Sequence, residues 1–354
     1  MIYWNVTHLI YVNVMSVIHS VLRNYVAHAA GKIKHKKLSL SEKVVVLPLC
    51  LYRWFRGLFK NSNNKITGQL YMSVRKTYTT ITNRKHHFVS SREMACDIDD
   101  WITTFPQRYD LIIGVPRSGL MVANIIALRL ARSLATPDMD AGKFWVSHHM
   151  VQPEVVSEIL LVDDSITTGV AMRQAYTEVQ RKYPHANITT ATLYATDDSK
   201  NLVDLYYRLV PVPRVFEWNI LHSKRGITAV DLDGLLCGEV THEDTKNPDA
   251  YLKFISEVRP YLIPSYCIDA IITNRLEGFR SQTETWLVRN GVKYTHLYMK
   301  PENVDFKDKF EFKINMIRRV KPLIYLESRR DEAEAVASST GVSVYCAESH
   351  EFYE

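Results

Sequence analysis

The 354-residue chain is poor in cysteine, and its cysteines are widely spaced. None of the five (Cys50, Cys96, Cys237, Cys267, Cys346) belongs to a CxxC pair, which argues against a zinc site or a disulfide framework and favours a reducing cytosol. Low-complexity tracts and internal repeats are also lacking, which excludes a solenoid. The composition, 46% hydrophobic and 23% charged, is typical of globular proteins, and the length suffices for two or three domains.

Acidic side chains are almost missing from the first quarter of the chain. Residues 1–90 contain fourteen Lys or Arg residues and a single acid, Glu42. Their net charge of +13, within a total of +6, leaves −7 for the other 264 residues. This asymmetry indicates an anionic partner for the basic region, either a membrane surface or nucleic acid.

The basic region also lacks a run that meets the requirements of a membrane span. Residues 2–22 are apolar but include two asparagines and two histidines, and no basic residue precedes them as in a secretory signal. Residues 44–59 are too short and contain Pro48 and two arginines. Their aromatic and basic residues are typical of an interfacial segment. We expect residues 1–69 to be a basic, aromatic and helical region that contacts a membrane surface or a partner; a packed helical subdomain is the alternative.

After residue 95, short apolar runs alternate with helical stretches. Such runs lie at 110–115, 159–164 and 188–195. Strands that are apolar on both faces and alternate with helices indicate a parallel sheet covered on both sides. Because ligands of such sheets bind at the carboxyl ends of the strands, the residues that follow each run are candidates for function.

A second alternating unit begins with AVDLDG at 229–234 and continues with apolar runs at 269–274 and 323–328. A stretch with two prolines and several basic residues, within 210–228, separates it from the first unit. The sequence therefore predicts an α/β fold with two tandem Rossmann-like parallel-sheet domains, 70–225 and 226–354, behind the N-terminal region 1–69.

Two adjacent carboxylates end the run ILLVDDSITTG at 159–169. The loop after a parallel strand can cradle a phosphate with backbone N–H groups at a helix start, and small hydroxyl residues allow close approach. Asp163 and Asp164, placed just before that loop, suit a ligand with vicinal hydroxyls. A ribose 5-phosphate has both features.

This segment resembles the phosphoribosyl-pyrophosphate (PRPP) motif of type I phosphoribosyltransferases. IIGVPRSGLMVA at 112–123 is similar to the pyrophosphate loop of that family and comes in the right order. The resemblance covers roughly 70–222 and implies PRPP and Mg²⁺ as ligands. Val170 and Ala171 depart from the Gly-Thr often found in the family, which removes one hydroxyl donor. The resemblance implies these PRPP-binding residues: Arg117, Ser118, Gly119, Asp163, Asp164, Ser165, Thr167, Thr168 and Gly169.

The second unit begins with a strand that also ends on acids, Asp231 and Asp233. Phosphoryl transfer requires a nucleophile, a proton donor and neutralisation of charge. Asp231 suits attack on phosphorus, and Asp233 suits protonation of the leaving alcohol and later activation of water. Mg²⁺ would screen the approach of the carboxylate to the phosphate.

AVDLDG resembles the DxDG motif of haloacid dehalogenase (HAD)-type phosphatases, and the resemblance covers about 226–354. It implies a threonine that binds phosphoryl oxygens and a lysine that neutralises charge, for which Lys307 and Lys309 are alternatives to Lys313. The short segment 240–268 implies a small cap that leaves room for a bulky phosphate ester. A degenerate domain kept as scaffold is the competing interpretation. The implied catalytic residues are Asp231, Asp233, Thr273 and Lys313, and the implied metal ligands are Asp231, Asp233, Glu327 and Asp331.

Together the resemblances predict a bifunctional phosphoribosyltransferase and phosphatase. PRPP would donate a phosphoribosyl group, and the second domain would remove the 5-phosphate to leave a ribofuranosyl group. This arrangement resembles the bacterial dual-domain ribofuranosyltransferases of surface-polysaccharide assembly, whose acceptor is a sugar hydroxyl of an O-antigen or capsule glycan, there lipid-linked. It implies a cytoplasmic enzyme, peripheral at the inner membrane, whose residues 1–69 contact that membrane or the assembly machinery. Specific nucleic-acid binding is not expected.

Two other functions fit the same motifs. One is a nucleobase phosphoribosyltransferase with nucleotidase activity in salvage. It differs from the glycan enzyme in its acceptor, which is a free base instead of a sugar hydroxyl. The other is a non-catalytic PRPP-sensing regulator, whose basic N-terminus would bind nucleic acid by charge. His148 and His149, between the two PRPP segments, are candidates for a role in catalysis. FEWN at 216–219 is either an acceptor platform or, as its aromatic spacing favours, part of the core.

Overall fold

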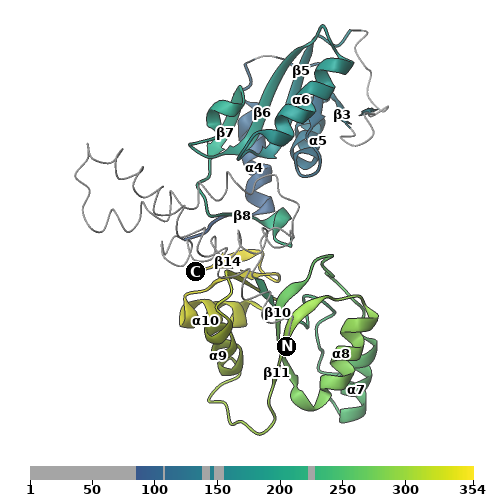
Figure 1. Ribbon diagram of the computed structural model, residues 1–354, viewed down its shortest axis with the longest axis vertical. Coiled ribbons are helices and arrows are strands. Elements are labelled where there is room, and N and C mark those ends of the chain that lie inside the picture. The colour runs from purple at the N-terminus through teal and green to yellow at the C-terminus, as the bar shows by residue number, and fades with distance from the viewer. Residues whose placement is uncertain (1–84, 107, 138–143, 147–154, 222–227) are drawn as a thin grey trace, which may run out of the picture. The chain divides into compact units, whose positions relative to one another are not determined.

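The computed structural model describes residues 85–106, 108–137, 144–146, 155–221 and 228–354 (Figure 1). These residues all belong to one compact body, Arg84–Glu354, which contains two α/β units, each built on its own sheet. The region 1–69, the boundary expected near residue 70, and His148 and His149 all lie outside the described residues. Within the described part of the chain, no helix is both long and apolar enough to cross a membrane.

The first α/β unit is built on a six-stranded sheet with the order β4-β3-β2-β5-β6-β7. All neighbouring strands are parallel except β3 and β4. The strands are β2 (Leu111–Gly114), β3 (Ser133–Pro137), β4 (Phe144–Val146), β5 (Glu158–Ser165), β6 (Asn187–Ala195) and β7 (Leu205–Leu209). The helices are α4 (Ser91–Ile102), α5 (Gly119–Leu130) and α6 (Val170–Lys182), with a short η1 (Lys200–Leu202) before β7.

The apolar strands of this unit bury both faces, as the sequence predicts. Successive side chains of a strand point to opposite faces, and Ile112 and Leu160 pack in one core while Ile113 and Leu161 pack in another. The first core contains buried residues of α4 and α5, and the second contains those of α6. Helices therefore cover both sides of a mostly parallel sheet, and the carboxyl ends of its strands stay available for ligands.

The second unit repeats this design with the strand order β11-β10-β9-β12-β13-β14. Only β13 and β14 pair antiparallel. The strands are β9 (Thr228–Val230), β10 (Ile268–Leu276), β11 (Tyr294–Lys300), β12 (Ile324–Glu327), β13 (Ser343–Cys346) and β14 (Glu351–Tyr353). The helices are α7 (Pro248–Glu257), α8 (Arg280–Arg289), α9 (Glu311–Val320) and α10 (Arg330–Thr340), with η4 (Glu277–Phe279) before α8.

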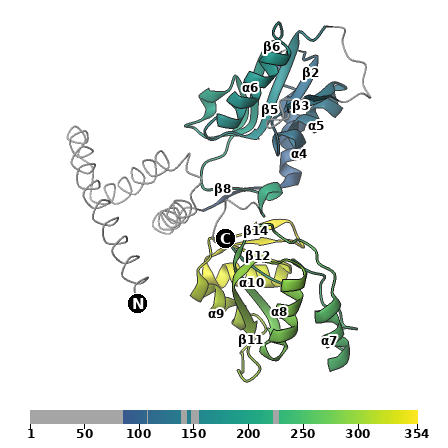
Figure 2. The same cartoon turned by 45° about the vertical axis from the view of Figure 1, so that its right-hand side comes forward.

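Two helices cover one face of this second sheet, and a third packs on the other. Residues of α9 and α10 join Ala270 and Tyr325 in one core, whereas Trp286 and Leu287 of α8 pack with Ile271 in the other. The remaining helix, α7, lies beside α8 and is the only α-helix between β9 and β10 in the described residues (Figure 2). The short insertion expected from the sequence is therefore a single helix with its flanking loops.

A two-stranded parallel pair, β1 (His87–Val89) with β8 (Arg214–Phe216), lies where the chain enters and leaves the first unit. Phe88 stacks on Phe352 with ring centroids 5.0 Å apart, and Val215 is part of the core that contains Trp286. The helical turn η2 (Glu217–Asn219) follows β8 directly. The stretch expected as a linker therefore begins with ordered, packed residues.

Candidate functional site

The two loops that resemble PRPP-binding segments lie side by side at the carboxyl edge of the first sheet. Strands β2 and β5 are parallel neighbours with Gly114 opposite Val162, and the strand order reverses between them. A Cβ on Gly119 would lie only 2.8 Å from Asp163 Oδ1, so glycine is required for the two loops to approach this closely. Such a switch point is where open α/β sheets bind ligands.

Asp163 and Asp164 are adjacent carboxyl groups near the carboxyl end of β5. The Asp164 backbone N–H donates to Asp163 Oδ1 at 2.9 Å, and Trp218 Nε1 donates to Asp164 Oδ2 at 2.8 Å. Burial raises the pKa of both carboxyls, and the Asp164 charge raises that of Asp163 further, to well above its ordinary value. A ligand that donates hydrogen bonds from hydroxyl groups would relieve this unfavourable burial of charge.

The hydroxyl-rich loop, residues 165–169, leads into the start of α6. Gly169 has φ +67°, a left-handed conformation that favours glycine, and caps the helix that begins at Val170. The free N–H groups of a helix start and its dipole attract a phosphate. Arg214, from β8, donates to Thr167 Oγ1 at 2.9 Å and to the Ile166 carbonyl at 2.8 Å, which brings a positive charge to the same loop.

The other loop carries Arg117 and Ser118, which both contact Asn219 of η2. Arg117 Nη2 donates to Asn219 Oδ1, and Ser118 Oγ does so at 3.3 Å. The η2 residues therefore contact side chains of both predicted PRPP-binding segments, since Trp218 reaches Asp164. The expectation that FEWN belongs to the core holds for buried Phe216, while partly exposed Trp218 lies at the site.

An aromatic stack runs from the first core to this site. Tyr194 stacks on Phe216 with centroids 5.3 Å apart, and Phe216 stacks on Trp218 with centroids 4.9 Å apart. Arg214 was not expected at the site, and Trp218 and Asn219 were expected only as part of the possible acceptor platform FEWN, not as partners of the PRPP segments. Their only signal is an aromatic and polar cluster just after a proline turn.

The second group of candidate residues gathers at the carboxyl edge of the second sheet. Strand β9 lies between β10 and β12, again where the strand order reverses, and Asp231 follows it directly. The Asp231 N–H donates to the Leu326 carbonyl at 2.8 Å, which ties it to β12. Thr273 belongs to β10 and Lys313 to α9, so residues far apart in the sequence meet at one edge.

Lys313 is buried among three carboxylates. Its Nζ lies 3.1 Å from Asp231 Oδ2 and 2.9 Å from Glu327 Oε2, and it also pairs with Glu332. Burial opposes its charge, but the surrounding acids raise the pKa of Lys313 well above its ordinary value. Burial and the Glu327 charge raise the pKa of Asp231 despite the lysine. Lys313, rather than Lys307 or Lys309, is thus the lysine that contacts Asp231.

The acids expected to bind a metal with Asp231 and Asp233 have protein partners. Glu327 accepts hydrogen bonds from Lys313, from Tyr325 Oη at 2.8 Å and from the Ser328 N–H at 2.8 Å. Asp331 pairs with Lys309 at 2.6 Å and with Arg329, and these cations lower its pKa to about 2. Within the described residues, no group of three or more His, Cys, Asp or Glu side chains is arranged to hold a metal ion. The Mg²⁺ site stays a prediction.

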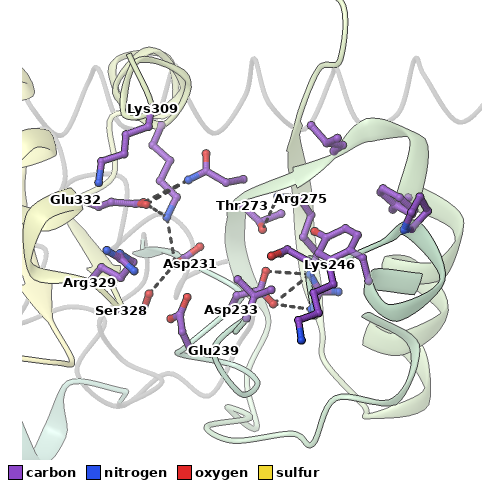
Figure 3. Close-up of a pocket in the computed structure, with 18 of the residues that line it drawn as sticks. Asp231, Asp233, Glu239, Lys246, Thr273, Arg275, Lys309, Ser328, Arg329 and Glu332 are labelled. Atoms are coloured by element: carbon purple, nitrogen blue, oxygen red, sulfur yellow. Dashed lines mark hydrogen bonds and ion pairs between the residues drawn. The ribbon is translucent and has the colours of Figure 1, made fainter. Parts of the chain in front are cut away.

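Asp233 is held by a buried arginine that was not expected from the sequence. Arg275, 1% exposed, donates from Nη2 to Asp233 Oδ1 at 2.6 Å and from Nε to Oδ2 at 3.0 Å (Figure 3). Burial opposes its charge, but Asp233 raises the pKa of Arg275 above its ordinary value. The signal in the sequence is a charged residue inside an apolar strand, two positions after Thr273.

Asp231, Asp233, Thr273, Arg275 and Lys313 are among the residues that line a cavity of about 720 Å³, whereas Glu327 and Asp331 are not. Figure 3 shows Asp231 and Asp233 between Lys309 and Glu332 on one side and Arg275 and Lys246 on the other. The cavity therefore offers four carboxylates, those of Asp231, Asp233, Glu239 and Glu332, together with a threonine hydroxyl and several cations. That combination suits an anionic group that is attacked by one carboxylate and exchanges a proton with another.

Comparisons with known proteins concern the first unit. Residues 78–222 match the family described as phosphoribosyl transferase domain. Among solved structures, xanthine-guanine-hypoxanthine phosphoribosyltransferase from Helicobacter pylori is 16% identical with a TM-score of 0.31, and the match covers 38% of this chain and 95% of that one. A purine phosphoribosyltransferase from Pyrococcus horikoshii Ot3 is 20% identical with a TM-score of 0.30, covering 38% and 93%. Orotate phosphoribosyltransferase from Aeropyrum pernix is 22% identical with a TM-score of 0.27, covering 33% and 71%. No curated protein matches this chain.

Proposed function

We propose that this chain, whose residues 78–222 form a phosphoribosyl transferase domain, transfers phosphoribosyl from PRPP to a sugar hydroxyl and then removes the 5-phosphate. One observation carries the proposal. A site suited to a ribose phosphate and a site suited to phosphate-ester hydrolysis occupy the carboxyl edges of two sheets in the same chain. The first reaction would make the kind of ester that the second consumes.

In the first step the acceptor oxygen would bond to C1 of the ribose as the bond from C1 to pyrophosphate breaks, and the acceptor hydroxyl would lose its proton to the departing pyrophosphate. Asp163 and Asp164 would accept hydrogen bonds from the ribose 2- and 3-hydroxyls, and residues 165–169 would hold the 5-phosphate. Arg117 would stabilise the charge that develops on the leaving pyrophosphate. Mg²⁺ bound to the pyrophosphate would supply further neutralisation.

PRPP would have to replace hydrogen bonds that Asp164 and Arg117 make with residues of η2. Trp218 Nε1 donates a hydrogen bond to Asp164 Oδ2, and Asn219 Oδ1 accepts one from Arg117 Nη2. Because PRPP would compete for both, η2 has to yield these two hydrogen bonds when the substrate enters. The rings of η2 and β8 would then border the acceptor.

In the second step Asp231 would attack phosphorus, and the bond from phosphorus to the ribose O5 would break. Asp233, which accepts hydrogen bonds from Arg275, would first take up a proton from solvent when the anionic ester binds and would then give it to that oxygen. Thr273 and Lys313 would hold the phosphoryl oxygens. Asp233 would then take a proton from water, whose oxygen would attack phosphorus and release phosphate from Asp231. Arg275 would keep Asp233 oriented through both transfers, as the contacts at 2.6 and 3.0 Å support.

We place the acceptor among the sugar hydroxyls of a surface-polysaccharide glycan, O-antigen or capsule. The second site supports this choice, because only one helix and its loops lie between Asp231 and β10, which leaves space for a large ester. A cytoplasmic enzyme at the inner membrane surface, with residues 1–69 contacting lipid or the assembly machinery, remains part of the proposal.

A nucleobase phosphoribosyltransferase with nucleotidase activity is the second candidate. The stack of Tyr194, Phe216 and Trp218 favours it, because it ends next to Asp164 and would offer a ring face to a planar base. Its products would be nucleosides. A non-catalytic PRPP sensor would transfer nothing.

Product analysis separates these functions. The full chain is incubated with PRPP, Mg²⁺ and either oligosaccharides or free bases, and the products are read by mass spectrometry. We expect a pentosyl adduct on a glycan with the unsubstituted protein, and a phosphopentosyl adduct with Asp231→Asn, which lacks the nucleophile. Adducts on bases would support salvage, and PRPP binding without any adduct would support the sensor.

A further inference from the structure

A second cavity, of about 570 Å³, adjoins the one that contains Asp231. Glu239, Ser328 and Arg329 line both cavities. Figure 3 shows these three side chains gathered beside Asp231, away from the pair formed by Asp233 and Arg275. A molecule held over Asp231 can therefore extend past Glu239 and Arg329 into the second cavity.

The junction between the cavities offers a hydroxyl, a carboxylate and a guanidinium. Ser328 Oγ donates to Asp231 Oδ2 at 3.1 Å, so it lies directly against the proposed nucleophile. Gly234 has φ +77°, and a Cβ there would lie 2.1 Å from Glu239 Oε2. Glycine thus makes room for the Glu239 carboxylate at the junction. Such groups exchange hydrogen bonds with sugar hydroxyls, which both donate and accept.

The second cavity is also lined by accessible apolar side chains. Tyr261 is 71% exposed and Leu262 is 41% exposed, although both are large hydrophobic residues. Glu348 and His350 add polar groups to the lining. An exposed ring next to a few placed polar groups is the usual composition of a small-ligand pocket, and it suits a sugar ring, which has an apolar C–H face and a rim of hydroxyls.

We infer that the second cavity binds the acceptor saccharide, the sugar to which the ribosyl group is attached, while the 5-phosphate lies over Asp231. This inference rests on the proposed function. The ribose carries phosphate on C5 and the new glycosidic bond on C1, so the attached sugar must lie outside the phosphate pocket. The cavity that shares Glu239, Ser328 and Arg329 with that pocket is the adjoining space available to it.

The test compares two phosphate esters with the full-length protein. One is ribose 5-phosphate, which has no second sugar, and the other is a synthetic methyl hexopyranoside that carries a 5-phosphoribofuranosyl group. Phosphate release gives kcat/KM for each. We expect the glycoside to be preferred, and Tyr261→Ala to lower the ratio of the two kcat/KM values about tenfold, mainly through KM. Glu239→Gln, at the junction, should lower the same ratio and does not depend on the folding of the Tyr261 variant.

Tyr206→Ala is the matched control, because Tyr206 is an exposed tyrosine on β7 that does not line either cavity. It should leave the ratio as in the unsubstituted protein. If the unsubstituted protein hydrolyses both esters but shows no preference, or if neither variant changes the ratio, the second cavity is not a saccharide site, while the phosphatase proposal stands. If it hydrolyses neither ester, the proposed function itself fails. A nucleoside 5′-monophosphate is assayed as a third ester, and a preference for it over the glycoside that is lost in Tyr261→Ala would overturn the saccharide in favour of a base.

Discussion

Replacing Arg275 by methionine should strongly destabilise the second unit. The Arg275 side chain is fully buried and donates to Asp233 from two nitrogens, from Nη2 at 2.6 Å and from Nε at 3.0 and 3.1 Å. Removing one partner of a buried ion pair leaves the other charge uncompensated and costs about 3–5 kcal/mol. The Asp233 side chain keeps 15% exposure towards the cavity, so water can partly replace the guanidinium. We therefore expect a loss at the low end, about 3 kcal/mol.

Urea unfolding of four proteins measures this effect: the unsubstituted chain, Arg275→Met, Asp233→Asn and the double variant. Because the uncompensated carboxylate causes most of the loss, the double variant should be less destabilised than the sum of the single variants, with a coupling of about 1–3 kcal/mol. Arg280→Met is the control. Arg280 pairs with Glu277 and Glu284 on the surface, where an ion pair is worth about 0–1 kcal/mol.

The reasoning is refuted if Arg275→Met costs no more than the Arg280 control. It is also refuted if the losses of the two single variants simply add, because the arginine would then act by its volume rather than by its charge on Asp233.

Two further predictions concern the first site. Trp218→Phe keeps the stacked ring but removes the N–H that competes for Asp164. The Kd for PRPP, measured by calorimetry, should therefore fall about tenfold or more, because a hydrogen bond to a charged group is worth roughly 1.5–3 kcal/mol; an increased Kd would contradict the competition. Asp163→Asn tests the raised pKa of that carboxyl. A folded-state pKa above the unfolded value means that the folded chain holds the Asp163 proton more tightly. The contribution of this carboxyl to stability is therefore greatest below about pH 4 and is lost as the pH rises through the folded pKa. The neutral amide should therefore stabilise the chain at pH 7 more than at pH 4 in thermal unfolding, and an equal change at both pH values would contradict the shift.

Much of the fold follows from local patterns in the chain. Runs such as ILLV at 159–162 are apolar at every position, and they become central strands buried on both faces. The same patterns place Asp163 and Asp231 at strand ends, and parallel pairing then brings distant loops to a common edge. What could be predicted is therefore what depends on period, strand ends and turn residues.

The contacts that could not be predicted are those between side chains of high sequence separation. Arg275 meets Asp233 across forty-two positions, and Trp218 meets Asp164 across fifty-four. Neither pair has a fixed spacing, because loop lengths between strands vary while the sheet stays the same. The ion pair of Lys313 with Glu327 is equally hard to predict from a motif, since it depends on where α9 packs over the sheet.

The helical turn Glu217–Asn219 also bears on how this chain could be divided. Two of its residues contact Asp164 and Arg117, while Glu217 accepts hydrogen bonds from Tyr345 Oη at 2.9 Å and from the Ser91 N–H. A truncated protein that contains only residues 78–222 would lack Tyr345, so the Glu217 carboxylate would lose that hydrogen-bond donor. Residues 78–222 therefore share a partly buried hydrogen bond with the second sheet and are not independent of it. Gene fusions or exchanges that swap one half for a homologue would need to carry Glu217 and the β13–β14 hairpin together as a matched set.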